Sequence, residues 1–252
     1  MDQSSVDRHY ANASRAEQQH YKTEYKGVPM LCEEGLHEEI AALIGSRLEP
    51  GQKVLDVGCG QGALSLRLHD QGLAVEAVDM YDHFKPKGVV PFTQSRAEDA
   101  VISGPYDCVF MVEIIEHVES PFALLRKYAA QVKPGGYLVV TTPNVDSDLS
   151  RAWFFLKGRH WYFEEQRVAD DGHITPVHQF QMRYMCEKLG LSIVEQRNVL
   201  ENRTVAPGAL WGLARLLKLY QRARGVAPNE GKISVYLLRK DAAAATAGAP
   251  LK

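Results

Sequence analysis

The chain has 252 residues, of which 45% are hydrophobic and 24% charged, and its formal net charge is −2. That apolar fraction excludes an intrinsically disordered chain, and the length favours one large α/β domain. The near balance of acidic and basic residues predicts no nucleic-acid partner, and four scattered cysteines without a Cys-x-x-Cys pair favour a reducing, cytoplasmic location over a disulfide scaffold.

Residues 1–32 are polar with scattered tyrosines, and they predict an irregular or helical lead-in without the apolar core of a signal peptide. Apolar residues at helical spacing predict a helix over 33–48. Strand and helix signals then alternate, which implies βαβ units and a mostly parallel sheet. The expected strands lie at 53–57, 74–78, 89–93, 106–112 and 137–142, the expected helices begin at 63 and span 121–131, and a turn is expected at 133–136.

The second half carries few strand signals before residue 191. Thr175-Pro176 is typical of a helix N-cap followed by proline at the first helical position, and Gly190 is typical of the end of that helix. The last two strands are expected at 191–200 and 232–240, with a helical insertion at 201–231 between them and a disordered Ala-rich tail at 241–252.

The strongest local signal is the glycine-rich turn Gly58-Cys59-Gly60, which follows the strand at 53–57. Glycines between a strand and a helix let a ligand approach the backbone closely. Asp79 ends the next strand, where a carboxylate accepts hydrogen bonds from the two ribose hydroxyls. Turn and acid together predict a site for an adenosine-containing cofactor at the carboxyl ends of the strands.

NAD is one candidate cofactor, because Gly58, Gly60 and Ala63 satisfy the dinucleotide fingerprint. Asp56 argues against it. A carboxylate inside the first strand has no use beside a pyrophosphate, whereas it suits a ligand that carries an ammonium or a sulfonium group. The alternative to NAD is therefore a positively charged adenosine cofactor.

Four segments in register, VLDVGCGQG, EAVDM, YDCVFMVEIIEHV and VKPGGYLVVTTPN, resemble the class I S-adenosylmethionine-dependent methyltransferases. The resemblance covers roughly residues 35–200. It implies an α/β fold with a Rossmann-like sheet of seven mostly parallel strands, helices on both faces and an antiparallel last strand. The methyltransferase domain is expected at 33–240.

The resemblance also implies which residues bind S-adenosyl-L-methionine. The turn from Gly58 to Gly60 passes under the methionine part, and Asp56 helps to orient that part. Asp79 holds the ribose, and Met80 flanks the adenine. The full set of implied cofactor contacts is Asp56, Gly58, Cys59, Gly60, Asp79, Met80, Ala97, Glu98 and Val112.

The segment from Glu113 through Glu116 to His117 most resembles the O-methyltransferases of ubiquinone biosynthesis. That resemblance implies a divalent cation, Mg²⁺, held by Glu113, Glu116 and His117. The alternative is a structural role in the cofactor pocket without a metal. An alcohol or phenol acceptor must lose a proton, and His117 and His173 are the candidate catalytic side chains. The alternative for His173 is that it organises its loop.

Two further segments are candidates for a functional role. Residues 143–190 contain several aromatic side chains and are expected to cover the acceptor, although these rings also suit an ordinary core. The helix at 209–224 carries a tryptophan and four cations without an acid, which predicts contact with the inner surface of an anionic membrane. The alternatives are packing over the substrate pocket or against a second subunit of a homodimer.

The sequence therefore predicts a cytoplasmic S-adenosylmethionine-dependent methyltransferase that acts on an oxygen of a small-molecule, lipid-linked or sugar-linked acceptor. Two other functions stay open. One is a protein that binds the cofactor and works through a partner without catalysis, and the other is an NAD-dependent enzyme.

Overall fold

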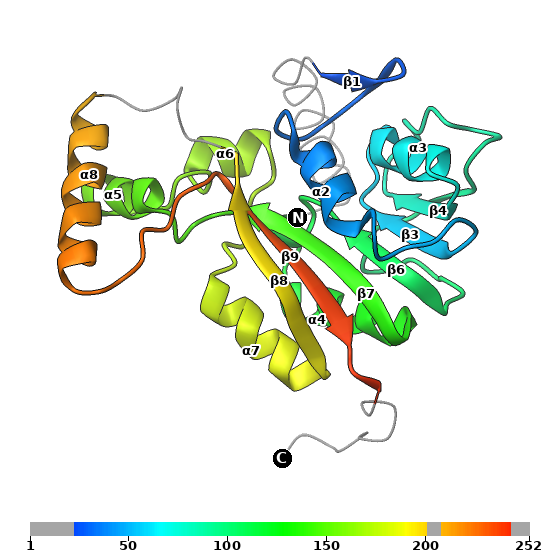
Figure 1. Ribbon diagram of the computed structural model, residues 1–252. Helices are drawn as coiled ribbons and strands as arrows, with labels where there is room; N and C mark the ends of the chain where they lie inside the picture. The colour runs from blue at the N-terminus through cyan, green and yellow to red at the C-terminus, as the bar shows by residue number, and fades with distance from the viewer. Residues whose placement is uncertain (1–22, 201–207, 243–252) are drawn as a thin grey trace.

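The computed structural model describes residues 23–200 and 208–242. The lead-in before residue 23 and the tail after residue 242 lie outside the described residues. A sheet of seven strands crosses the molecule in the order β5-β4-β3-β6-β7-β9-β8 (Figure 1). Its strands are β3 (Lys53–Val57), β4 (Ala74–Asp79), β5 (Phe92–Gln94), β6 (Tyr106–Met111), β7 (Val132–Pro143), β8 (Leu191–Val199) and β9 (Ile233–Lys240).

The strand directions confirm the predicted fold class. The pairings from β5 through β4, β3 and β6 to β7 are all parallel. β9 runs antiparallel to both β7 and β8, so the last strand of the chain is inserted in the reverse direction. The strand order reverses between β3 and β6, and in open α/β sheets ligands bind outside the carboxyl ends of the strands at such a switch point.

Each face of the sheet packs against its own hydrophobic cluster. Cys108 and Phe110 of β6 belong to the first cluster and Val109 and Met111 to the second, as expected for side chains that alternate along a strand. Helices α2 (Leu36–Ile44) and α3 (Ala63–Asp70) cover the first face. The other face is covered by α4 (Pro121–Gln131) and α7 (Gln179–Leu189).

The remaining elements lie at the ends of the strands. A short hairpin of β1 (Glu24–Tyr25) and β2 (Val28–Pro29) precedes α2, and a 3₁₀ turn, η1 (Ile115–His117), follows β6. Helices α5 (Asp148–Lys157) and α6 (Glu165–Asp170) lie between β7 and α7. Helix α8 (Gly208–Ala223) packs on α5, and the two project from the body of the molecule (Figure 1). Among the described residues, no helix has both the length and the apolar character of a membrane span.

Three sequence expectations about local structure are wrong. The hairpin formed by β1 and β2 replaces the end of the expected lead-in. Residues 133–136 belong to β7 and do not form a separate turn. The pairing of β6 with β7 shifts register between Tyr106 and Cys108, and this irregularity accommodates Gly135 and Gly136. Helix α7 begins at Gln179 with His178 as its N-cap, three residues beyond Pro176.

The late start of α7 has a tertiary cause. The backbone N–H groups of Ile174 and Thr175 both donate to the carbonyl oxygen of Glu116, at 3.1 and 3.0 Å. The Thr175 hydroxyl also donates to the Val118 carbonyl at 2.8 Å. These bonds hold Thr175 against the loop after β6, and its hydroxyl does not cap a helix.

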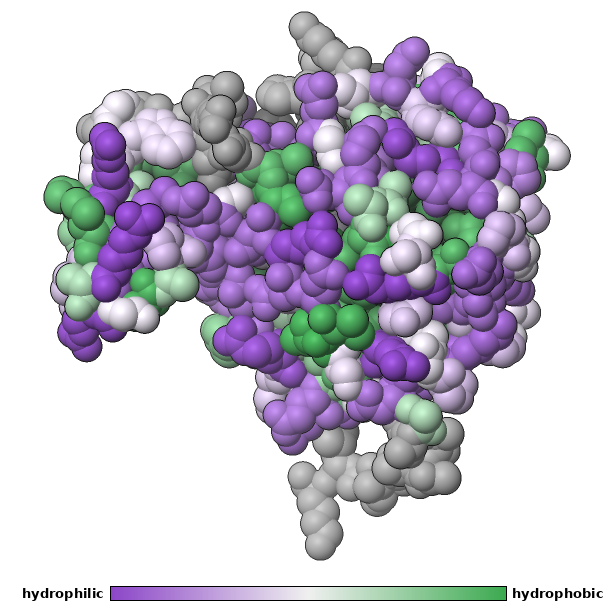
Figure 2. Space-filling view, viewed as in Figure 1, coloured by the Kyte–Doolittle hydropathy of each residue, from purple (hydrophilic) through white to green (hydrophobic). Residues whose placement is uncertain are grey.

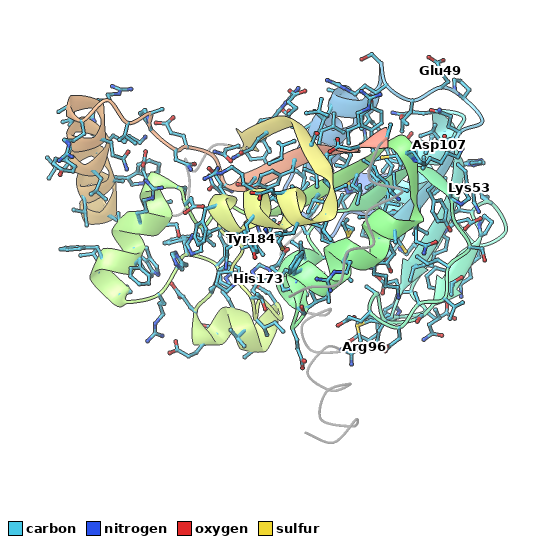
Figure 3. The ribbon with its side chains drawn as sticks, turned by 90° about the horizontal axis from the view of Figure 1, so that it is seen from below. Glu49, Lys53, Arg96, Asp107, His173 and Tyr184 are labelled. Atoms are coloured by element: carbon cyan, nitrogen blue, oxygen red, sulfur yellow. The ribbon has the colours of Figure 1, made fainter. Side chains whose placement is uncertain are left out.

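Lys53 and Asp107, at the amino ends of β3 and β6, lie on the same side of the molecule (Figure 3). Lys53 begins β3, and its N–H donates to the Asp107 carboxylate at 2.9 Å. This pair lies toward one side of the molecule, while Arg96, which follows the carboxyl end of β5, and His173, which lies between α6 and α7, lie away from it (Figure 3). The candidate site lies on the side of Arg96 and His173.

Candidate cofactor pocket and active site

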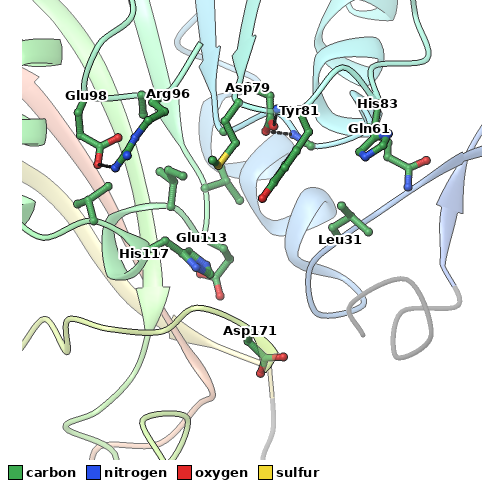
Figure 4. Close-up of a pocket in the computed structure, with 17 residues that line it drawn as sticks. Leu31, Gln61, Asp79, Tyr81, His83, Arg96, Glu98, Glu113, His117 and Asp171 are labelled. Atoms are coloured by element: carbon green, nitrogen blue, oxygen red, sulfur yellow. Dashed lines mark hydrogen bonds and ion pairs between the residues drawn. The ribbon is translucent and has the colours of Figure 1, made fainter. Parts of the chain in front are cut away.

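A pocket opens at the carboxyl ends of β3, β4 and β6 (Figure 4). Asp79 and Tyr81 lie toward one end of it and Asp171 toward the other, with Glu113 and His117 between them. Its lining residues are Leu31, Gly58, Gly60, Gln61, Asp79, Met80, Tyr81, His83, Arg96, Ala97, Glu98, Val112, Glu113, Ile114, His117, Val118 and Asp171.

Most of the expected cofactor contacts line this pocket. They are Gly58, Gly60, Asp79, Met80, Ala97, Glu98 and Val112. Asp56 and Cys59 do not; they line a smaller cavity on the other side of the glycine turn. Asp56 is buried there, accepts a hydrogen bond from the Ser65 hydroxyl at 2.6 Å, and has its pKa raised to about 7 by burial. It thus connects β3 to α3 behind the turn.

Asp79 closes the glycine turn. One carboxylate oxygen accepts from the N–H of Gly60 at 2.8 Å, and the other accepts from the N–H of Tyr81 at 2.9 Å. Burial nevertheless raises the pKa of Asp79. Each carboxylate oxygen has a second lone pair, so the side chain can still accept bonds from two ligand hydroxyls.

Gly58 shows why this turn needs glycine. Its φ is +71°, a backbone conformation that L-residues with a side chain rarely adopt. A Cβ at this position would lie 2.8 Å from the Ile114 side chain. The N–H groups of Gly58 and Cys59 donate to the carbonyl of Val78, at 2.8 and 3.1 Å. The turn is therefore held by β4 and passes close beneath the loop that follows β6.

Glu113 has an unusual conformation for an acidic residue. Its φ of +50° lies in the left-handed region. A non-glycine residue in this conformation costs about 1–3 kcal/mol, and such residues are often found at functional sites. Its N–H donates to the Thr141 hydroxyl at 3.0 Å, and that hydroxyl donates to the Glu113 carboxylate at 2.7 Å. Burial raises the pKa of Glu113 to about 7, although the Thr141 bond opposes the shift.

The second group of titratable side chains comprises Glu116, His117 and His173, whose ligand atoms all lie within 4.8 Å of one another. The imidazole rings of His117 and His173 meet edge to face with centroids 4.9 Å apart. Burial lowers the pKa of His117 to about 3 and that of His173 to about 4, so both rings are neutral near pH 7. His173 Nδ1 lies 3.0 Å from the Tyr162 carbonyl, which assigns the proton to Nδ1.

The expected Mg²⁺ ligand set of Glu113, Glu116 and His117 is not assembled. Glu113 turns to Thr141, and His173 takes its place in the cluster. Two imidazoles and one carboxylate do not fit Mg²⁺, which prefers oxygen ligands. His117 lines the pocket and His173 does not, so His173 meets the pocket through its contact with the His117 ring.

The aromatic side chains expected to cover the acceptor divide into three groups. Trp153 and Trp161 meet edge to face at 4.8 Å and pack with α5 and α8. Phe163 lies beside His173, with ring centroids 5.6 Å apart. Phe154 and Phe155 are exposed. None of these rings lines the pocket, to which the segment 143–190 contributes Asp171.

Sequence reasoning missed several pocket residues. Leu31 arrives from the segment after β2, and its side chain lies 3.2 Å from where a Cβ on Gly60 would be. No local pattern marks Leu31 for this role. Tyr81 and His83 follow Asp79 directly and stack at 5.8 Å, so their place could have been inferred from the strand end. The missed lining residues are Leu31, Gln61, Tyr81, His83, Arg96, Ile114, Val118 and Asp171.

Comparison with known proteins decides the family. Residues 31–196 match the family model described as a methyltransferase domain. The chain belongs to the methyltransferase domain family. This membership confirms the resemblance drawn from the four sequence segments. It also places the glycine turn, Asp79 and the loop after β6 within one matched domain.

Curated methyltransferases match part of the chain. The ubiquinone biosynthesis O-methyltransferase of Vibrio parahaemolyticus is 39% identical over 105 residues, which are 37% of this chain and 45% of that protein. The protein of the same name from Xanthomonas axonopodis pv. citri is 39% identical over 113 residues, covering 40% of this chain and 47% of its own length. The matched segment thus spans under half the length of these relatives.

Solved methyltransferases share the fold. A SAM-dependent methyltransferase from Archaeoglobus fulgidus has a TM-score of 0.56 at 20% identity, covering 81% of this chain and 94% of its own. Phosphoethanolamine N-methyltransferase 2 of Haemonchus contortus, solved in complex with S-adenosyl-L-methionine, has a TM-score of 0.58 at 18% identity, covering 84% of this chain and 54% of its own. At these identities the likeness concerns the fold.

Proposed function

We propose that this chain is an S-adenosylmethionine-dependent methyltransferase that transfers the methyl group to an oxygen of a small-molecule acceptor. The observation that carries the proposal is the pairing of Asp79 with the glycine turn in a pocket that also contains Glu113 and His117. Asp79 offers acceptors for the ribose hydroxyls, and Met80 and Ala97 offer apolar surface for the adenine. The residues that line the pocket therefore fit this cofactor.

The chemistry requires little from the protein beyond alignment and proton removal. When bound, S-adenosylmethionine supplies an activated methyl group, which passes to the acceptor oxygen as the carbon–sulfur bond breaks and sulfur keeps the electron pair. The pocket walls orient the acceptor and exclude water. The acceptor proton must go to a base on the chain.

Glu113 is the base that the geometry favours. It lines the pocket, and its left-handed backbone and the Thr141 hydroxyl hold its carboxylate in place. A carboxylate with a pKa of about 7 suits the removal of a proton from a phenol near neutral pH. His117, with a pKa near 3, is a poor base but can donate or accept a hydrogen bond at the acceptor.

The oxygen acceptor has separate support. The curated relatives that match part of the chain are named ubiquinone biosynthesis O-methyltransferases. The one candidate ligand cluster among the described residues, Glu116 with His117 and His173, is rich in imidazole and does not suit Mg²⁺, so we propose Glu113 as the proton acceptor. This favours an acidic hydroxyl, such as a phenol, over an aliphatic alcohol.

The test combines binding with an acceptor screen. Calorimetry should show that S-adenosylmethionine binds and that NAD does not. Labelled methyl groups should then pass to phenols, at equal rates with and without a chelator, and not to amines. Tight NAD binding would overturn the cofactor assignment. Cofactor binding without transfer to any acceptor would support the non-catalytic alternative, and label on nitrogen would overturn the oxygen assignment.

A further inference from the structure

Helices α5 and α8 form a small unit beside the sheet with their own hydrophobic cluster. The side of α8 that packs on α5 carries Leu210, Leu213, Ala214 and Leu217, a spacing that places them on one face of a helix. Leu149 and Ala152 of α5 belong to the same cluster, with Trp153 and Trp161 packed against it. These contacts account for the inner face of α8, so the apolar residues elsewhere on the helix have another explanation.

The outer face of α8 carries a second apolar stripe. Leu216, Leu219 and Tyr220 are 64%, 60% and 61% exposed. Their spacing of three and four residues places them side by side on one face, where a surface helix normally presents polar side chains. Phe155 of α5, which is 77% exposed, adds an aromatic ring to the same projecting unit. Figure 2 shows hydrophobic residues at the edge of the molecule over α8, beside strongly hydrophilic ones.

The charge of α8 has one sign. The helix contains Arg215, Lys218 and Arg222 and no acidic residue. Lys218 forms an ion pair with Glu230. With 100° of rotation per residue, Arg215 and Arg222 project along one edge of the exposed stripe. An apolar stripe bordered by arginines is the pattern of a helix that lies in a membrane interface.

We propose that the outer face of α8 docks on the surface of a bilayer that contains anionic lipid head groups. The stripe of Leu216, Leu219 and Tyr220 enters the interface, and Arg215 and Arg222 meet the head groups. A second copy of the chain fits less well, because a symmetric contact through this face would bring arginines against arginines. The proposal does not depend on methyltransferase activity.

Vesicle co-sedimentation of the full chain tests this docking. The protein should sediment with vesicles of phosphatidylcholine and phosphatidylglycerol, and much less with phosphatidylcholine alone or at high salt. Because each basic side chain near an anionic surface contributes about 1 kcal/mol, the double variant Arg215→Gln, Arg222→Gln should bind about 30-fold more weakly. The double variant Leu216→Ser, Leu219→Ser should lose about tenfold or more.

Matched controls remove similar groups elsewhere. Arg126→Gln with Lys188→Gln removes two exposed cations from α4 and α7, and Val101→Ser removes a side chain that is 91% exposed. These variants should sediment like the wild type, and all variants should keep its thermal unfolding midpoint. The proposal is overturned if sedimentation does not depend on phosphatidylglycerol, or if controls and α8 variants behave alike. It is also overturned if the α8 substitutions dissociate a dimer without changing vesicle binding.

Discussion

The N–H of Gly60 donates to the Asp79 carboxylate at 2.8 Å, so the acid that ends β4 holds the glycine turn that ends β3. The same carboxylate has lone pairs left for a ligand. One side chain therefore shapes the turn and offers the hydrogen bonds that a ribose needs. This double role makes Asp79 the first residue to test.

Replacing Asp79 with alanine should weaken S-adenosylmethionine binding by about 100-fold or more, because it removes the ribose acceptors and releases the turn. Titration calorimetry measures the change. Asp82→Ala is the matched control, because Asp82 follows in the same loop, pairs with Lys87 and does not line the pocket. Equal affinity of the Asp79 variant and the control would show that Asp79 does not hold the cofactor.

Glu113→Gln should lower the methyl-transfer rate by about 100-fold or more while the cofactor still binds. A base must be deprotonated to act, so the wild-type rate should rise with pH through about 7, the pKa of Glu113, and then level off. The variant should lose this rise. A wild-type profile that is flat between pH 6 and 8 would remove Glu113 from the reaction.

Thr141→Val should reproduce part of this loss, because it removes both hydrogen bonds that hold Glu113. We expect a rate about tenfold lower and a loss of about 1–3 kcal/mol in the free energy of unfolding. Thr142→Val is the control. Thr142 is the next residue and equally buried, and its hydroxyl has no hydrogen-bond partner among the described residues, so valine should be tolerated there. Similar losses in both variants would contradict a specific Thr141 role.

His173 should make the fold sensitive to acid. Burial lowers the pKa of its imidazole from 6.5 to about 4. Between pH 6.5 and pH 4 the ring is therefore protonated in the unfolded chain and neutral in the folded chain. The stabilisation by this group is complete above pH 6.5 and falls by about 1.4 kcal/mol per pH unit toward pH 4. The stability difference between wild type and His173→Asn should therefore shrink over that range in chemical denaturation. A constant difference would mean that the ring titrates alike in both states.

Gly58→Ala should destabilise the chain by about 2 kcal/mol or more, because the added Cβ would meet the Ile114 side chain at 2.8 Å on a strained backbone. Gly88→Ala separates the two causes. Gly88 has a φ of +83° but no atom within 4 Å of an added Cβ, so it reports the backbone strain alone. The excess loss at Gly58, measured by thermal unfolding, is then due to the close approach of the loop after β6.

The sequence alone predicts well where the strands lie along the chain, because the signals for a strand are local. Short apolar runs mark β3, β4 and β6, and the actual bounds of β3 and α4 equal the expected ones. The glycine turn and Asp79 are likewise readable, since a turn and a strand end are encoded by a few adjacent residues. The resemblance to the methyltransferases rests on four such local segments, and the family model that matches residues 31–196 confirms it.

The tertiary structure decides which side chains of the loop after β6 work together. Glu113, Glu116 and His117 are close in sequence, yet Glu113 turns to Thr141 on β7 and the other two turn to His173. The contact of Glu113 with Thr141 depends on the neighbouring strand β7. The cluster with His173 depends on the hydrogen bonds from Ile174 and Thr175 to the Glu116 carbonyl.

The same limit applies to Leu31 in the pocket and to the two apolar stripes of α8. A helical projection shows that α8 is apolar on more than one side, but only the packing on α5 shows which stripe is already covered. Local patterns therefore determine the elements and the cofactor turn. Contacts between segments far apart in the chain determine the reacting groups and the free surface, because they depend on how the sheet brings its strand ends together.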